Sequence, residues 1–344
     1  MQKLRIAVTM GDPAGIGPEI TAKLFLLPEI YKNASVTVIG DLTTMIDTQR
    51  RVSNKLSIRP VTSFNEKMAK GVINLFDMKL IKYGEVPLGA ETKKGGKAQY
   101  YYVKKAIEAA LKGEVDAIVT APINKHALHM AGIMYPGHTE ILAEETGVKN
   151  FGMMLMCPQL KVMLVTTHTS LKSVSGLLTV KKVLEKIELA HTAMKNDFGI
   201  KAPKIAVLGL NPHSGEAGAF GDEEIKIITP AIKAARKKGI DAQGPYPPDT
   251  IFGKLIHKQS HDIAVCMYHD QGLIPLKLIG FESGVNVTLG LPIVRTSPDH
   301  GTAYDIAGTN TASAESMLTA FKTAVVIAQN RVKGVSTNRV KRHE

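Results

Sequence analysis

The feature that most constrains the fold is an alternation of short apolar runs with longer amphipathic segments. Seven apolar runs have strand length: Leu4–Met10, Val36–Ile39, Val115–Thr120, Gly152–Cys157, Val162–Thr166, Ile205–Leu210 and Ile263–Tyr268. Four segments carry apolar residues at helical spacing: Lys97–Lys112, Val180–Asp197, Glu223–Lys238 and Ala312–Gln329. Runs that are apolar throughout are typical of strands covered on both faces. The alternation predicts an α/β protein with a largely parallel sheet and helical layers.

One stretch, residues 57–96, fits neither pattern, and we expect an insertion or a short connecting pair of strands there. The chain of 344 residues is long enough for one large domain or two ordinary ones. The two cysteines, Cys157 and Cys266, lie in apolar runs, so we expect reduced core residues of a cytoplasmic protein. No signal peptide or membrane-spanning run is evident, and we expect no membrane partner.

The net charge of +12 admits several anionic partners, because basic proteins bind nucleic acid, anionic membranes or anionic substrates. The charge is spread thinly, and its densest cluster, residues 331–342, is expected to be a frayed end. There is no tryptophan, aromatic residues make up only 5%, and no nucleic-acid-binding motif accompanies the charge. The sequence therefore predicts no nucleic-acid partner.

Two glycine-containing loops are candidates for anion binding. Thr9–Glu19 has glycines at positions 11, 15 and 17, which match neither the dinucleotide fingerprint nor a P-loop. It is either a phosphate loop or a tight strand-to-helix turn. In Tyr135–Glu140, His138 and Thr139 precede a predicted helix, whose free N–H groups favour anions. The alternative is that Thr139 only caps this helix.

Three histidines follow apolar runs that are predicted to be strands. His168, His213 and His269 are each placed at or just after a strand's carboxyl end, so in a parallel sheet they can meet at one edge. Three histidines with open positions describe a catalytic divalent-metal site, and Asp270 is a candidate partner for its neighbour His269. The other interpretation is three separate structural histidines, since the sequence has no short H-x-x-x-H pattern.

The last loop region, residues 277–310, offers Lys277, Asn286 and Arg295 in glycine-broken, strand-like surroundings. Arginine binds phosphate or carboxylate as a fork and lysine binds them as a point charge. Each of these side chains is either a substrate contact or a solvated surface group.

Long sequence blocks resemble the 4-hydroxythreonine-4-phosphate dehydrogenase family of vitamin B6 synthesis. They include GDPAGIGPE (11–19), TAPINK (120–125), YPGHTE (135–140), TTH (166–168), GLNPHSGE (209–216), MYHDQG (267–272), GVNVTLGLPIVRTS (284–297) and HGTAYDIAG (300–308). The resemblance covers nearly the whole chain. It implies a fold like that of isocitrate and isopropylmalate dehydrogenases, with two α/β domains and a cleft between them. The expected domains are residues 1–125 plus 285–344 on the cofactor side, and 126–284 for metal binding and dimerisation.

The resemblance also implies roles for individual residues. The metal ligands fall on His168, His213 and His269; the substrate contacts fall on His138, Thr139, Lys277, Asn286 and Arg295. The cofactor, NAD or NADP, is expected near His300, Gly301, Thr302 and Asp305. The metal is one divalent ion per site: zinc, magnesium, cobalt or manganese. The family is a homodimer, so we expect the metal site to be shared, with His269 reaching the partner's metal. For the general base, Lys277, Asp249 and a metal-bound water stay open.

The implied reaction is the oxidation and decarboxylation of 4-hydroxy-L-threonine 4-phosphate to 3-amino-2-oxopropyl phosphate. Within the same family, the alternative is the oxidation of D-threonate or D-erythronate 4-phosphate to dihydroxyacetone phosphate and CO₂. Relatives that act on aromatic cis-dihydrodiols are a further branch. Outside the family, the alternatives are a phosphate acetyltransferase-like enzyme, which needs no metal, and a non-catalytic module that binds through the basic tail.

Overall fold

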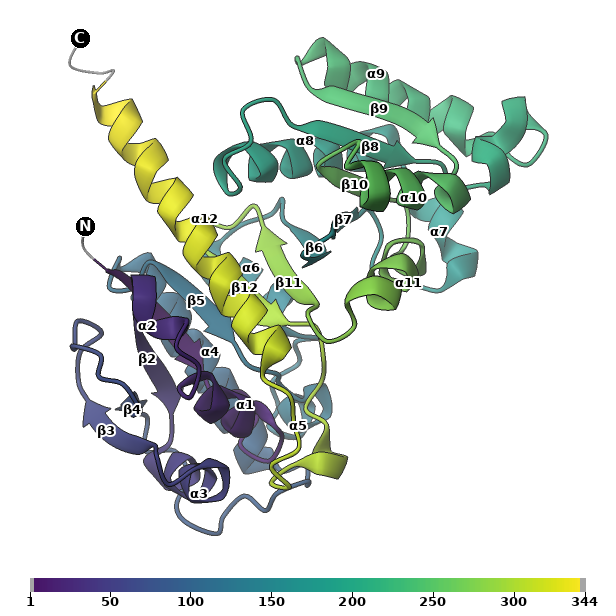
Figure 1. The fold of residues 1–344 in the computed structure, drawn as a ribbon. Coiled ribbons are helices and arrows are strands. Elements are labelled where there is room, and N and C mark those ends of the chain that lie inside the picture. The colour runs from purple at the N-terminus through teal and green to yellow at the C-terminus, as the bar shows by residue number, and fades with distance from the viewer. Residues whose placement is uncertain (1–2, 341–344) are drawn as a thin grey trace. The chain divides into compact units, whose positions relative to one another are not determined.

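A computed structural model describes residues 3–340 of the chain, with side chains to Gly334, and divides it into two compact units (Figure 1). The first unit spans Met1–Lys149 and Leu291–Gln329, and the second spans Asn150–Gly290 and Asn330–Glu344. The chain thus passes between the units near residues 149, 290 and 329. None of the helices among the described residues is long and apolar enough to cross a membrane.

The first unit contains a parallel sheet. Its strands lie in the order β3 (Ser57–Val61), β4 (Val72–Asp77), β2 (Ala34–Gly40), β1 (Leu4–Thr9), β5 (Ala117–Thr120) and β12 (Arg295–Pro298). Each pair of neighbours in this order is parallel, so the loops after β1, β5 and β12 share one edge. The stretch expected to be irregular contributes β3 and β4, which extend the sheet rather than forming an insertion.

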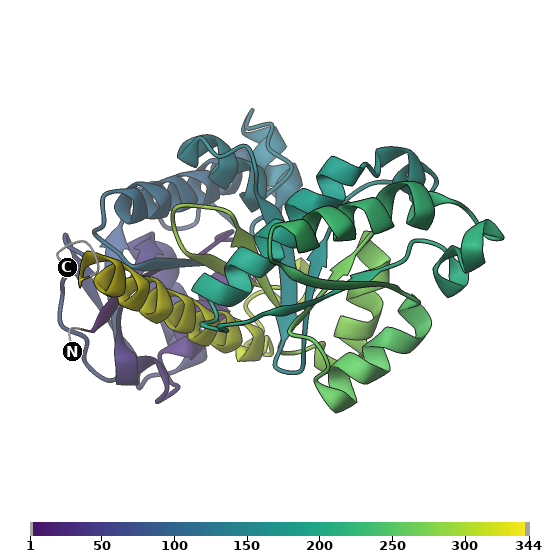
Figure 2. The same ribbon diagram turned by 90° about the horizontal axis from the view of Figure 1, so that it is seen from above.

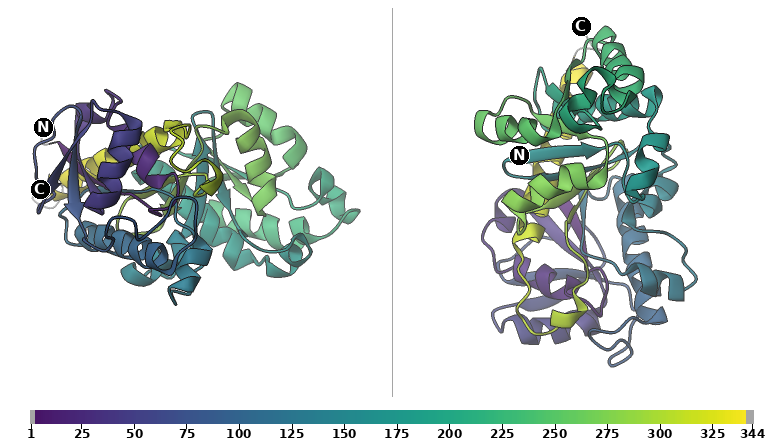
Figure 3. Two further views of the ribbon diagram at one scale, coloured as in Figure 1. Left: turned by 90° about the horizontal axis from the view of Figure 1, so that it is seen from below. Right: turned by 90° about the vertical axis from the view of Figure 1, so that its right-hand side faces the viewer.

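Helices cover both faces of this sheet, as Figures 2 and 3 show. The helix α4 (Lys93–Leu111) lies on one face, and α1 (Gly17–Leu24), α3 (Leu42–Val52) and the first part of α12 (Glu315–Val340) lie on the other. The shorter helices are α2 (Ile30–Asn33), α5 (Lys125–Met130), α6 (His138–Thr146) and the turn η3 (Tyr304–Ile306). The expected frayed end is instead helical to Val340, and positions 341–344 lie outside the described residues.

The second unit has a mixed sheet. Its strands lie in the order β11 (Val285–Leu289), β6 (Gly152–Cys157), β7 (Leu160–Leu164), β10 (Ile263–Cys266), β8 (Lys204–Leu208) and β9 (Asp241–Tyr246). From β7 to β9 the pairing is parallel, but β6 is antiparallel to both of its neighbours. The expected α/β class with largely parallel strands is confirmed, with β6 as the departure.

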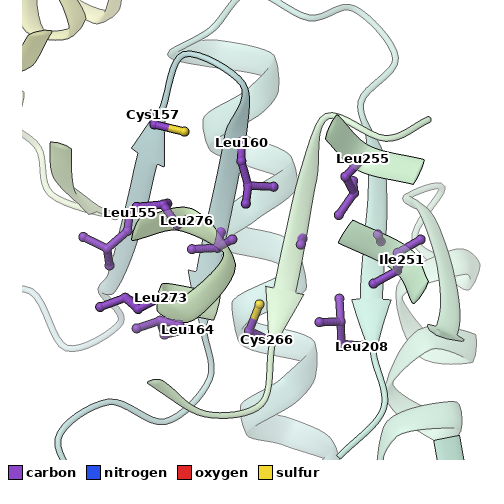
Figure 4. Packing of buried hydrophobic residues seen from close by; sticks show 13 residues of the cluster. Leu155, Cys157, Leu160, Leu164, Leu208, Ile251, Leu255, Cys266, Leu273 and Leu276 are labelled. Carbon is purple, nitrogen blue, oxygen red and sulfur yellow. The ribbon is translucent and has the colours of Figure 1, made fainter. Parts of the chain in front are cut away.

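The core of the second unit packs helices on that sheet (Figure 4). On one face, α10 (Pro248–Lys258) and α11 (His269–Gly280) cover β6, β7, β8 and β10, and both expected core cysteines are buried there. The other helices are α7 (Leu171–Leu177), α8 (Val180–Asn196), the turn η1 (Pro212–Gly218), the π-helical turn η2 (Glu224–Ile228) and α9 (Thr229–Lys237). The single helix expected over 223–238 is divided into η2 and α9 because Pro230 has no N–H for a regular helical bond.

Two glycines let α11 approach the sheet closely. A Cβ at Gly272 would meet Cys266 Sγ and Leu164 Cδ2 at 3.1 Å, and one at Gly280 would lie 2.4 Å from Cys157 Cβ. These two glycines are therefore needed for close helix-to-sheet packing. As a result, Lys277 lies on a helix, which corrects the expected strand-like surroundings.

Candidate active site

The predicted site residues fall into two groups, one in each unit. The second unit holds the candidate metal ligands His168, His213 and His269, together with Asp249, Lys277 and Asn286. The first unit holds His138, Thr139, Arg295, His300, Gly301, Thr302 and Asp305. Most of them lie on loops or at helix ends, but Asn286 and Arg295 lie in strands and Lys277 lies on a helix.

The three histidines follow three neighbouring parallel strands, β7, β10 and β8. His168 lies four residues after the end of β7, and His213 lies in the turn η1 after β8. His269 is the first residue of α11 and not the end of a strand, because β10 stops at Cys266. The expectation that these loops share one sheet edge therefore agrees with the strand order.

The structure brings two of the three imidazoles together. The ring centroids of His168 and His269 are 5.6 Å apart, with the rings inclined at 45°. His269 Nδ1 donates a hydrogen bond to Asp270 Oδ1 at 2.7 Å, the contact expected from their adjacency. This hydrogen bond to Asp270 favours the tautomer of His269 with its proton on Nδ1. In that neutral tautomer Nε2 has a free lone pair, which can bind a metal.

His213 sits in a turn with unusual backbone geometry. Four of its non-glycine residues have positive φ angles: His213 (51°), Ser214 (54°), Glu216 (40°) and Ala217 (55°). Such conformations each cost roughly 1–3 kcal/mol and are frequent at functional sites. Among residues 3–340, no group of three His, Cys, Asp or Glu side chains lies close enough to hold a metal ion. Within one chain, His213 therefore does not complete a trio with the paired histidines.

A buried carboxylate anchors the turn that carries His213. Glu224 Oε1 accepts hydrogen bonds from the backbone N–H groups of Leu210 (2.6 Å) and Asn211 (2.7 Å). Asn211 Nδ2 donates to Glu224 Oε2 at 2.9 Å and to Glu223 Oε2 at 2.7 Å. The sequence analysis missed Glu224, because nothing in the pattern distinguishes a buried glutamate at a helix start from the exposed charges around it.

A pocket opens beside the paired histidines. It has a volume of about 640 Å³, within the range of small-molecule sites, and is lined by residues 167–171, 174, 268–270 and 274. His168 and His269 both line it, and both are at least partly exposed. Polar groups and two imidazoles on an open pocket suit a ligand that reaches them from solvent.

The remaining candidates in the second unit differ in exposure. Lys277 is half-buried on α11, and its Nζ lies 5.8 Å from the ring centroid of Phe281. Asn286 lies within β11, and its Oδ1 is buried with no hydrogen-bond partner among the described residues. Asp249 is exposed in the first turn of α10, which lies against the turn η1. A buried amide oxygen without a protein partner, such as that of Asn286, can accept a hydrogen bond from a bound ligand or from water.

In the first unit, the buried Arg295 and the half-buried His138 form a basic group. Arg295 is 2% exposed, and its Nε and Nη2 donate to Thr120 Oγ1 at 3.1 and 2.8 Å. Burial lowers the pKa of Arg295 to about 9, and the nearby Glu140 carboxylate opposes this shift. Burial is the larger cause, and the positive charge of Arg295 the smaller one, that holds the pKa of His138 well below its usual value. His138 is therefore neutral at pH 7. Nε2 of His138 is buried without a partner in the described structure.

The start of α6 adds backbone donors beside this group. The N-cap is Gly137, which has no side chain, so the first-turn N–H groups lack a side-chain acceptor. Thr139 is buried inside the first turn and is not the cap, which removes the capping interpretation. Free N–H groups at a helix start, next to a buried guanidinium, suit an anion.

The expected cofactor loop is tied to the glycine-containing loop 9–19. Ile16 N donates to Thr302 O at 2.9 Å, and Tyr304 OH donates to Asp12 Oδ2 at 2.7 Å. A side chain at Gly15 would lie 2.7 Å from Thr302 O, so this glycine permits the contact. His300, Gly301 and Asp305 remain exposed on the loop. The loop 9–19 is thus a strand-to-helix turn that supports the 300–305 loop; the sequence analysis did not predict the Asp12–Tyr304 bond.

The half-buried His138, whose Nε2 is shielded from solvent, predicts a pH dependence of stability. Its folded pKa is below that of the unfolded chain, so below about pH 6.5 the unfolded state binds the extra proton. Below about pH 6.5 the free energy of unfolding should therefore decrease as the pH is lowered, by up to about 1.4 kcal/mol per pH unit. His138→Gln should flatten this slope in urea titrations, with the exposed His257→Gln as control. An equal flattening in both variants would contradict the prediction.

Comparison with known proteins identifies the family. The family model described as "Pyridoxal phosphate biosynthetic protein PdxA" matches residues 32–324. The chain belongs to this family. Among PdxA relatives, the 4-hydroxythreonine-4-phosphate dehydrogenase of Geobacter metallireducens is 48% identical over 333 residues, covering 96% of this chain and 97% of its own. The D-threonate 4-phosphate dehydrogenase of Salmonella typhimurium is 46% identical, covering 95% of this chain and 100% of its own.

A solved structure agrees with this PdxA assignment. The 4-hydroxythreonine-4-phosphate dehydrogenase of Klebsiella pneumoniae superposes with a TM-score of 0.88 at 43% identity, covering 95% of this chain and 99% of its own. The resemblance inferred from the sequence blocks is therefore confirmed, and the chain is a member of a family of dehydrogenases.

Proposed function

We propose that the chain oxidises and decarboxylates 4-hydroxy-L-threonine 4-phosphate to 3-amino-2-oxopropyl phosphate, with a divalent metal and NAD or NADP. The observation that carries this is the His168–His269 pair on an open pocket, in a chain that is 48% identical to a 4-hydroxythreonine-4-phosphate dehydrogenase. In this proposal the first unit binds the cofactor and the second binds the metal and forms the dimer.

The histidines fit a metal site chemically. Two imidazoles whose centroids are 5.6 Å apart can bind one ion through nitrogen, and Asp270 fixes His269 in the tautomer that does so. We assign His168, His213 and His269 as ligands of zinc, magnesium, cobalt or manganese. When bound, the metal stabilises negative charge on the substrate oxygen and the nicotinamide accepts the two electrons. The residues 300–305 are assigned to hold the nicotinamide cofactor.

The basic group of the first unit is assigned to the substrate's phosphate. Arg295 offers a fork of donors, and the free N–H groups at the start of α6 offer further ones. His138, neutral and with an unpartnered Nε2, donates or accepts one hydrogen bond without adding charge. Thr139 supplies its hydroxyl and backbone N–H within the same turn.

The second unit is assigned the other polar contacts and the proton. Asn286 Oδ1 accepts a hydrogen bond from a hydroxyl or amino group of the substrate. The half-buried Lys277 binds an anionic group, and it is also a candidate to take the hydroxyl proton. Asp249, exposed on α10, is the second candidate base. The decisive measurement for this pair is the pH dependence of kcat for Lys277→Met and Asp249→Asn.

A second substrate has specific support from the 46% identity with a D-threonate 4-phosphate dehydrogenase. The same phosphate, metal and hydride-accepting groups serve both reactions. Purified enzyme should be assayed for reduced nicotinamide with each cofactor against the 4-phosphates of 4-hydroxy-L-threonine, D-threonate and D-erythronate. The proposal expects the highest kcat/KM with the first. A preference for either sugar acid would overturn the substrate assignment and leave the dehydrogenase assignment in place.

A homodimer with a shared metal site is also proposed, on the basis of an exposed apolar surface. On α11, Ile274, Leu278 and Phe281 follow helical spacing and are 67%, 84% and 78% exposed, and Leu171 of α7 is 71% exposed. Such clusters on soluble proteins mark interfaces. Since Ile274 and Leu171 also line the histidine pocket, a second copy on this surface adjoins the metal site.

This surface predicts the effect of one substitution on assembly. Leu278→Asp places a charge on the proposed interface and should convert the dimer to a monomer in light-scattering measurements. Activity should fall by about 100-fold or more, because one ligand of each metal then has no partner to supply it. Leu111→Asp, at a 49% exposed leucine of the first unit, is the matched control and should stay dimeric. A Leu278→Asp dimer with full activity would contradict the proposed interface.

A further inference from the structure

A buried hydrogen-bond network links the three loops that carry the histidines. Gln271, on the first turn of α11, is 6% exposed. Its Nε2 donates to Gly209 O at 2.8 Å, and its Oε1 accepts from Met267 N at 2.7 Å. One amide thus joins the loop before His269 to the loop before His213.

A threonine makes the corresponding link to the third loop. Thr166 Oγ1 donates to Met267 O at 2.7 Å, and Thr166 N donates to the same oxygen at 3.2 Å. Its side chain is 3% exposed. Thr166 precedes His168 by two residues, and Met267 precedes His269 by two. This link therefore joins the two segments just before the paired histidines.

The position of these bonds gives them a specific effect. The strands β7, β10 and β8 end at Leu164, Cys266 and Leu208. Past these ends, backbone bonds from Val165 N to Cys266 O (2.8 Å) and from Thr166 N to Met267 O (3.2 Å) still join the first two segments. The side chains of Thr166 and Gln271 add further bonds there, and that of Gln271 reaches the segment after β8. Both side chains are shielded from water. Loss of the Gln271 amide leaves Met267 N and Gly209 O without these partners, at a cost of about 1–3 kcal/mol, whereas Met267 O keeps the bond from Thr166 N when the Thr166 hydroxyl is removed.

We propose that Gln271 and Thr166 are positioning residues, which hold the histidine loops in place beyond their strand ends and thereby set the affinity for the divalent metal. This inference rests on the proposed metal site. Neither side chain contacts the metal in this proposal; each acts through the backbone of a neighbouring loop. Partners of this kind change metal affinity by about 10–100-fold when removed.

Two matched pairs of variants test the inference. Thr166→Val removes one hydroxyl without changing shape, and Thr296→Val does the same in the first unit, where Thr296 Oγ1 donates to Ala320 O at 2.8 Å. Gln271→Met removes the bridging amide, and its control is Gln99→Met. Gln99 is equally buried and uses both amide atoms on Asn124 (2.9 and 2.7 Å). Each pair loses similar bonds, so a general loss of stability affects both members.

The first readout is the Kd for Co²⁺ in the full-length protein, measured through the visible absorption of the bound ion. Thr166→Val and Gln271→Met should weaken binding by about 10–100-fold, with Thr166→Ser near the parent, whereas the controls keep the parent Kd. The second readout is amide hydrogen exchange of residues 209–214 and 166–169, which should be faster in Gln271→Met and Thr166→Val respectively.

The two readouts separate the possible failures. Parent-like Co²⁺ affinity in both variants would overturn the positioning role. Equal losses of affinity in the variants and their controls would also overturn it. Faster exchange in a chain whose parent form binds no Co²⁺ would instead overturn the proposed metal site, and the positioning role with it.

Discussion

His213→Ala is expected to reduce kcat/KM by about 10³-fold or more and to leave less metal bound to the purified protein. The reason is that a Lewis-acid metal contributes several kcal/mol to the stabilisation of developing charge, and each 1.36 kcal/mol changes the rate tenfold. Metal content by mass spectrometry and steady-state kinetics are the measurements. Normal metal content together with normal activity would remove His213 from the ligand set.

The same variant shows which histidines share a chain. The expected arrangement takes His269 from the partner, but the structure pairs His168 with His269 in one chain at 5.6 Å and leaves His213 outside. We therefore expect an equimolar mixture of His213→Ala and His269→Ala chains to regain about a quarter of the parent activity, since half of the dimers are mixed and one of their two sites is intact.

The matched mixture uses His168→Ala and His269→Ala chains. If these two histidines act from one chain, no mixed dimer has an intact site, and activity stays at the level of the single variants. Recovery in this second mixture would separate His168 from His269 and support the original pairing. No recovery in the first mixture would place the three ligands in one chain.

Hydrophobic patterning was enough to predict the α/β class, because strands buried on both faces and amphipathic helices leave distinct periods. It failed where packing overrides local preference. The stretch from Gly272 to Gly280 contains glycines and Pro275, which discourage helix, yet it forms α11 because those glycines let the helix touch the sheet. The irregular stretch 57–96 gave no period because β3 is largely exposed.

Sequence blocks assigned the candidate site residues, but not the atoms that hold them in place. The left-handed turn at His213 and its anchor Glu224 have no periodic signal, since both depend on contacts between segments 13 residues apart. The roles of Gln271 and Thr166 also depend on long-range contacts, 62 and 101 residues along the chain. Both residues belong to blocks quoted for the resemblance, which is the only sequence signal that could have found them.

Arg295→Met is expected to lower kcat/KM for the phosphorylated substrate by about 10²–10³-fold, mainly through KM. Removing one member of a buried charge pair costs about 2–5 kcal/mol, and Arg295 is the buried cation assigned to the phosphate. Arg295→Lys should recover only part of this loss, because lysine keeps the charge but lacks the fork of donors. Arg5→Met, at an arginine paired with Asp116 in the same unit, is the control and should keep the parent KM.

Thermal stability separates a binding role from a structural role for Arg295. Burial lowers the pKa of Arg295 to about 9, so keeping the guanidinium charged costs the ligand-free protein free energy. Exchange of Arg295 for an apolar side chain of similar volume removes this cost of burying a charge. We therefore expect ligand-free Arg295→Met to unfold at the parent Tm or above it. The stabilisation that inorganic phosphate gives the parent should be absent from the variant. A lower Tm with unchanged KM would show that Arg295 supports the fold and does not bind the substrate.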